Sequence, residues 1–123
     1  MSLADPAAGL VRLIAIFCAF WDSDLPSFGA LFAAASADPE LEASLSERNA
    51  RRRRAIAVLV DRMADGPKVS AQARLDLVDV LFVLTSYGVF AQLAVGRTRD
   101  GVCRLIQATA ADAVARASRG KGD

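Results

Sequence analysis

Apolar side chains along this chain recur at intervals of three and four residues, the spacing typical of helices with one buried face. Five segments show this pattern, and no segment alternates apolar and polar residues between hairpin turns as a strand would. The connections between the segments are short, which favours antiparallel packing of successive helices. The pattern therefore predicts an all-α fold, a five-helix antiparallel bundle. The stripe of the first helix is Leu10, Leu13, Ile14, Phe17, Cys18 and Trp21.

The ends of these helices are marked by capping residues. Asp-Pro pairs at positions 5–6 and 38–39 are typical helix starts, as are Ser70 and Thr98. Glycines are expected to end the third, fourth and fifth helices. Together these signals predict one helical domain over residues 5–119, after a disordered or vector-derived start at 1–4 and before a frayed tail at 120–123. The glycines are Gly66, Gly96 and Gly120.

Composition limits the kinds of chemistry that this chain is expected to perform. The 123 residues are 54% hydrophobic, carry a net charge of +1 and include no histidine, the commonest general base and metal ligand. Asp76 and Asp79 lie three apart with no nucleophile nearby, so we predict no enzyme activity, no metal site and no cofactor. Cys18 and Cys103 fall within apolar helical patterns and are interpreted as reduced. The apolar runs are too short to span a membrane, so a cytoplasmic protein is expected.

The segment 80–95 is apolar nearly all round, as is typical of a helix buried on several sides. The helix that follows has a middle built of small residues, which allow helix backbones to approach closely. These features predict a homodimer through the last two helices, and the alternative is an ordinary core beside an alanine-rich solvent-facing helix. The predicted interface residues are Leu84, Val89, Leu93, Leu105, Ile106, Thr109 and Ala113.

Aromatic residues gather in the first, second and fourth helices, and they have two interpretations. They are a small-molecule pocket, with Thr85, Ser86, Tyr87 and Gln92 as orienting polar groups, or they simply fill the core. Spacing alone favours the core. The rings are Phe17, Phe20, Trp21, Phe28, Phe32, Phe82, Tyr87 and Phe90.

The arginine run at 51–54 points in almost every direction around a helix. The apolar stripe from Leu45 to Ile56 passes through Asn49 and Arg52, so one polar side chain is expected to point inward. Glu47, four residues before Arg51, suits a surface ion pair. The run is an anchor for an acidic ligand or a solvated helix end, and the pattern favours the solvated end.

Several of these segments resemble the C-terminal domain of TetR-family regulators. The stretches DPEL (38–41), ERNARRR (47–53) and LVDRM (59–63) resemble the long central helix of that family. The stretch LFVLTSY (81–87), with the helix from Thr98, resembles its two C-terminal dimerisation helices. The resemblance extends from about Pro6 to Ser118, and it is specific in arrangement but diffuse in motif.

This resemblance implies an effector-sensing and dimerisation domain of a transcriptional regulator, usually a repressor, that binds a small hydrophobic or amphipathic ligand. DNA contact is expected only through an N-terminal helix-turn-helix domain that is missing here. A piece of a longer regulator and a stand-alone effector domain both fit, and the alternative function is a helical protein–protein interaction domain without a small-molecule ligand. The resemblance also favours a pocket, with candidate ligand-binding residues Phe17, Trp21, Phe28, Phe32, Met63, Tyr87 and Gln92.

Overall fold

The computed structural model describes residues 6–64 and 69–119, and over these ranges every regular element is an α-helix. The all-α prediction is thereby confirmed. The predictions for the start at 1–4, the cap at Asp5, the helix stop at Gly66 and the tail from Gly120 lie outside the described residues. The helices are α1 (Pro6–Ser23), α2 (Leu25–Ala35), α3 (Pro39–Ala64), α4 (Ala71–Leu84), α5 (Tyr87–Leu93) and α6 (Arg99–Arg119).

The expected count of five helices was wrong, because the predicted fourth helix breaks at Thr85 and Ser86 into α4 and α5, bent by 57°. The Thr85 hydroxyl donates to the carbonyl of Leu81 (2.9 Å), and the Ser86 side chain caps α5 by accepting from the amide of Val89 (3.3 Å). These local bonds compete with a continuous helix. Within the described residues no single helix is long and apolar enough to cross a bilayer; α4 and α5 reach that length only as the bent pair.

Other helix ends follow the capping signals. Asp38 accepts hydrogen bonds from the amides of Glu40 (3.1 Å) and Leu41 (3.2 Å), and Ser70 accepts from the amide of Ala73 (3.0 Å). Gly96 has a φ of +78°, the left-handed conformation that glycine adopts without strain. The predicted cap residues Asp38 and Ser70 are therefore confirmed, and Gly96 takes the conformation expected between the last two helices.

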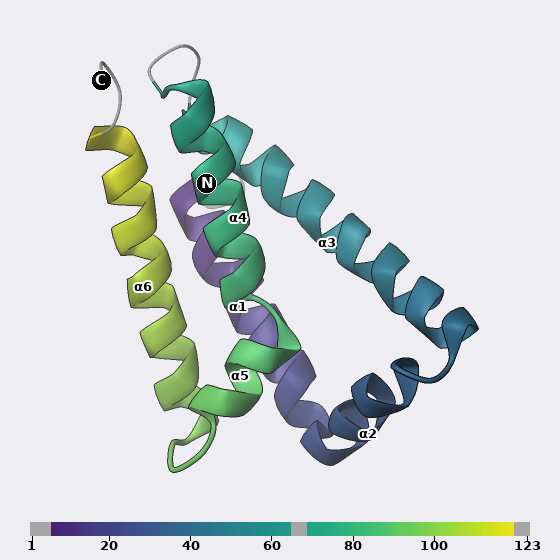
Figure 1. The fold of residues 1–123 in the computed structure, drawn as a ribbon. Helices are drawn as coiled ribbons and strands as arrows, with labels where there is room; N and C mark the ends of the chain where they lie inside the picture. Colours follow the sequence, from purple (N-terminus) through teal and green to yellow (C-terminus); the bar gives the residue numbers. More distant parts are fainter. Residues whose placement is uncertain (1–5, 65–68, 120–123) are drawn as a thin grey trace.

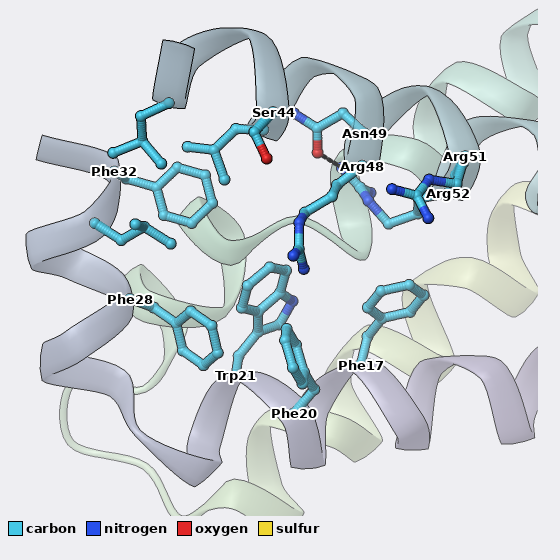
Figure 2. Close-up of a pocket in the computed structure, with 13 residues that line it drawn as sticks. Phe17, Phe20, Trp21, Phe28, Phe32, Ser44, Arg48, Asn49, Arg51 and Arg52 are labelled. Atoms are coloured by element: carbon cyan, nitrogen blue, oxygen red, sulfur yellow. Dashed lines mark hydrogen bonds between the residues drawn. The ribbon is translucent and has the colours of Figure 1, made fainter. Parts of the chain in front are cut away.

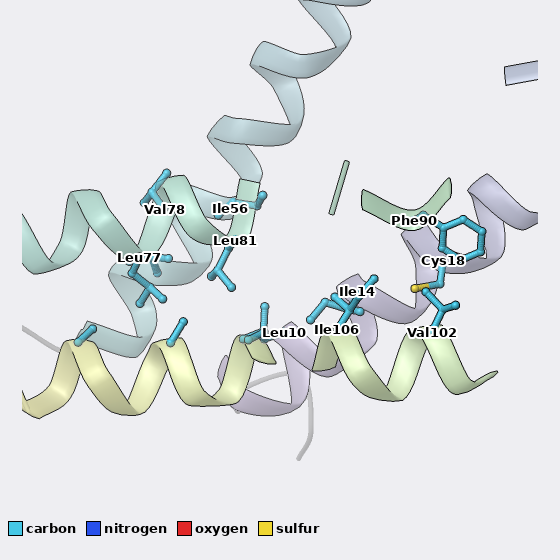
Figure 3. Close-up of a cluster of buried hydrophobic side chains, with 14 of the residues drawn as sticks. Leu10, Ile14, Cys18, Ile56, Leu77, Val78, Leu81, Phe90, Val102 and Ile106 are labelled. Carbon is cyan, nitrogen blue, oxygen red and sulfur yellow. The ribbon is translucent and has the colours of Figure 1, made fainter. Parts of the chain in front are cut away.

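The helices divide the molecule into a closed end and an open end. Figure 1 shows α4 and α6 running side by side with α1 behind them, whereas α3 leans away from α4 and meets α2 at its other end. The closed end contains branched aliphatic side chains from α1, α3, α4 and α6 (Figure 3). This aliphatic core is almost fully buried, and its most buried members are Ile14, Ile56, Val60, Leu81, Val102 and Ile106.

Candidate functional site

A cavity of about 510 Å³ lies at the open end, between α1, α2 and α3 (Figure 2). The two longer helices are close at one end because Gly9 of α1 faces Leu59 of α3, where an added Cβ would lie 3.2 Å from the leucine Cδ1. Towards the other end bulky rings on α1 and the short α2 stand between them. The cavity is lined by Phe17, Phe20, Trp21, Phe28, Leu31, Phe32, Leu41, Ser44, Leu45, Arg48, Asn49, Arg51 and Arg52.

One wall of the cavity is a set of aromatic rings held by their mutual contacts. The indole of Trp21 meets the ring of Phe28 edge-on at 5.1 Å between centroids, and its N–H donates to the carbonyl of Thr85 at 3.0 Å. Tyr87 of α5 stacks on Phe32 at 4.9 Å. Its hydroxyl reaches Gly29 of α2, where an added Cβ would lie only 2.8 Å away. These contacts fix the apolar wall before any ligand binds.

The opposite wall contains Arg52, and of the two polar residues on the α3 stripe, Asn49 and Arg52, it is the arginine that is buried. It donates to the carbonyl of Phe82, to the Thr85 hydroxyl (2.6 Å) and to the side-chain oxygen of Asn49 (3.2 Å). Its guanidinium also lies 4.0 Å from the centroid of the Phe82 ring. The positive charge thus lies at the C-terminal end of α4, where the helix dipole and unpaired carbonyls favour a cation.

The charge of Arg52 persists in this environment. Burial, with a smaller contribution from the nearby charge of Arg53, lowers the pKa of Arg52 to about 10. The guanidinium is therefore still protonated at neutral pH. It is a fixed positive charge in a partly dehydrated place, where water screens it less than at the surface.

Arg48 and Arg51 line the cavity beside it and are exposed. Figure 2 shows Arg48 directed from α3 into the cavity towards Trp21. No lining residue is acidic, and across the part of the chain that the structure describes these two arginines take part in no ion pair. The pair of Arg51 with Glu47 suggested by the spacing does not form. Arg53, outside the cavity, pairs with Asp79.

The predicted ligand-binding residues separate into three groups. Phe17, Trp21, Phe28 and Phe32 line the cavity, and Tyr87 packs behind them without lining it. Met63 lies near the far end of α3 against the aliphatic core, and Gln92 is exposed on α5, so neither belongs to the cavity. The polar wall was missed as a unit, although residues 41, 45, 48 and 52 follow the three-and-four spacing of one α3 face.

The suggested polar groups have structural roles instead. Thr85 is buried, and its bonds to Arg52 and to the backbone of α4 occupy its hydroxyl. Ser86 caps α5 and donates to the carbonyl of Val83 (2.7 Å). Neither residue lines the cavity, so the polar groups available to a ligand come from α3.

The predicted interface residues are also divided. Ile106 (2% exposed) and Ala113 (5% exposed) belong to the core of their own chain, so they offer no free surface to a partner. Leu84, Val89, Leu93 and Leu105 are half-buried, and Thr109 is exposed. Next to Leu84, Val83 of α4 is 54% exposed. The large apolar side chains exposed in this region are Val83 on α4 and Val95 after α5, and the homodimer stays a prediction.

The cysteines lie together although they are far apart in sequence. Both are free thiols, and Cys18 of α1 is buried against α6, where Cys103 is its neighbour. Burial, followed by the contact with Cys103, raises the pKa of the Cys18 thiol to about 12. A thiol held protonated in this way is a poor nucleophile. Over residues 6–64 and 69–119, no three side chains of His, Cys, Asp or Glu are grouped to hold a metal.

Comparisons of the chain with protein-family models, with curated proteins and with solved structures find no match. The cavity, with its aromatic wall and its arginine wall, is therefore the feature of this chain that points to a function.

Proposed function

We propose that this chain is the effector-sensing and dimerisation domain of a TetR-like transcriptional regulator, and that a small hydrophobic or amphipathic ligand binds in the cavity between α1, α2 and α3. The observation that carries the proposal is the aromatic-lined cavity of about 510 Å³. Its size is in the range of pockets that enclose small molecules, and its lining has the usual composition, mostly apolar with a few polar groups.

The way the rings are held supports binding rather than an unfilled defect. Trp21 is 9% exposed and its N–H is already bonded to Thr85, so the polar edge of the indole needs no water from the cavity. Because the rings are held by contacts within the chain itself, a ligand would lose little free energy in ordering its site. The ligand gains apolar contact with side chains that are otherwise exposed to solvent.

The proposal of a regulator also requires that the chain forms a dimer and that it acts together with a DNA-binding domain outside this sequence. In support of the dimer, the outer face of α4 exposes Leu75 and Val83, two large apolar side chains on one helix. Exposed apolar side chains that share a face favour association with another surface.

Ligand binding is tested through Trp21, the only tryptophan of the chain. A panel of alkyl and aromatic amphiphiles is titrated while the fluorescence and the melting temperature are recorded. A ligand at about a hundred times its Kd stabilises the folded state by about 2.7 kcal/mol, which raises the melting temperature measurably. A helical interaction domain without a small-molecule ligand predicts no change in either signal, and that result across the panel would overturn the proposal.

The dimer is tested by sedimentation. Val83→Asp on α4 should give a monomer that remains folded, because the side chain is 54% exposed and no core contact is lost. The matched control is Val58→Asp on α3, where the valine is 53% exposed on a helix outside the predicted interface. If both variants are dimers, the outer face of α4 is not the dimer interface. If the parent chain is a monomer, the dimer proposal is wrong.

A further inference from the structure

Resting on the proposed function, we infer that the ligand is an anionic amphiphile: its carboxylate, or a similar compact anion, binds Arg48 and Arg51 of α3, and its apolar body covers Trp21. Three arginines line the cavity and none of its thirteen lining residues is acidic. The whole chain carries a net charge of only +1, so this local excess of positive charge is a property of the cavity and not of the protein.

The two exposed arginines are free to bind a ligand. Neither forms an ion pair with any described residue, and Arg48 reaches over the apolar wall instead of away from it (Figure 2). Guanidinium groups bind carboxylates through two parallel hydrogen bonds, which makes arginine better suited than lysine to a planar anion. A head group between these side chains leaves its apolar tail against the rings of α1 and α2.

Arg52 supports this site without being its anchor. A guanidinium has five N–H donors, and three hydrogen bonds of Arg52 go to Phe82, Thr85 and Asn49. The side chain is therefore fixed to the end of α4, and its charge stays beside the cavity whether or not a ligand is bound. This buried charge attracts an anion and repels a cation more strongly than a mobile surface arginine would.

The arginines should give neutral, cationic and anionic amphiphiles different affinities for the cavity. A neutral amphiphile gains the apolar contacts but leaves both exposed arginines in water, at no cost and with no gain. A cationic amphiphile places its charge near three guanidinium groups. An anion alone gains both the apolar and the ionic contacts, so affinity should follow the order anion, neutral, cation.

The test compares ligands that differ only in the head group, using the full chain at neutral pH. Octanoate, octanol and octylamine form one series, and naphthoate with naphthalenemethanol forms a second series of aromatic shape. Dissociation constants come from Trp21 fluorescence and calorimetry. We expect each carboxylate to bind about tenfold or more tightly than its alcohol, as hydrogen bonds to charged groups imply. Added salt should weaken carboxylate binding and leave alcohol binding unchanged.

Matched variants assign the effect to the arginines. In the double variant Arg48→Gln with Arg51→Gln, the preference for carboxylate over alcohol should fall severalfold, to the part that the fixed charge of Arg52 supplies, and alcohol binding should stay unchanged. Both residues are exposed, so the fold is retained. The control Arg54→Gln removes an exposed charge of the same run that does not line the cavity, and should keep the preference.

The outcomes separate the two proposals. Equal affinity for carboxylate and alcohol overturns the anion inference and leaves the proposed ligand binding intact. A carboxylate preference that is as large in the double variant as in the parent also overturns the inference. No binding in either series overturns both.

Discussion

The two ends of the bundle use apolar residues in opposite ways. At the closed end, Ile14, Leu81 and Ile106 from three helices fill the space between backbones almost completely. At the open end, α1 and α2 present larger rings, yet a cavity of about 510 Å³ remains. Branched aliphatic side chains on closely packed helices make a core, whereas rings on diverging helices line a space. Apolar content alone therefore does not distinguish a filled core from the lining of a cavity. The separation between the helices does.

The sharpest test of this comparison removes one large side chain from each end. Leu81→Ala should lower the free energy of unfolding by about 3 kcal/mol, because it leaves a void in a fully packed core. Phe28→Ala should cost about 1 kcal/mol, although it removes more atoms, since its ring is half-buried beside existing space. Urea unfolding at constant m measures both values. Equal losses would mean that the two ends are packed alike.

The boundary between the ends depends on the bonds around Thr85. Thr85→Val keeps the shape of the side chain but removes the hydroxyl that accepts from buried Arg52. We expect a loss of about 2 kcal/mol in unfolding free energy, because a buried charged donor loses a partner. The control is Ser36→Ala, which removes an exposed hydroxyl bonded to the carbonyl of Ala33 and should change stability far less. A loss no larger than the control would show that Arg52 finds other partners.

The packing of α1 against α6 should also show a loss of stability at alkaline pH. The pKa of Cys18 is raised to about 12 in the folded chain against an ordinary value of 9.0, so between these values the unfolded chain loses the proton and the folded chain keeps it. The contribution of this thiol to stability is thus complete below pH 9 and declines as the pH rises towards 12. Unfolding measured across this range should show a flatter decline in Cys18→Ala. An unchanged slope would show that the thiol ionises equally in both states.

The smallest effect on stability is expected from filling the cavity. Ser44→Leu places an apolar side chain into the open space from α3, and the free energy of unfolding should change by less than about 0.5 kcal/mol. The same change should abolish the response of Trp21 to ligands. The control Ala33→Leu adds a comparable side chain at an exposed position of α2 that does not line the cavity. A variant that still binds as the parent does would place the ligand elsewhere.

Local signals predicted much of the fold. The caps at Asp38 and Ser70 mark helix starts because a side-chain oxygen beside free amides acts within one turn. The break at Thr85 was missed, because the apolar run continues through it and only the hydroxyl bonds reveal the end of α4. Where a helix is apolar on both sides of a break, periodicity carries no sign of the bend.

The candidate site was less predictable from the sequence than the fold, because the cavity exists only where α3 diverges from α1. Spacing placed Phe17 and Trp21 on an inner face correctly, and it indicated that either Asn49 or Arg52 turns inward, which Arg52 does. It did not show that Met63 and Gln92 lie away from the cavity, because that depends on the divergence of α3 from α1 and on the bend of α5. These are relations between helices, and no pattern within one helix contains them.

The contact of Gly29 with the hydroxyl of Tyr87 links one glycine of α2 to the shape of the cavity wall. A methyl group there would meet the phenol at 2.8 Å and force the ring to shift against Phe32, its stacking neighbour and part of the cavity lining. The depth of the cavity thus depends on Gly29, a residue that does not line it. If the cavity binds a ligand as proposed, one added carbon at this position would change the preferred length of that ligand without replacing any lining side chain.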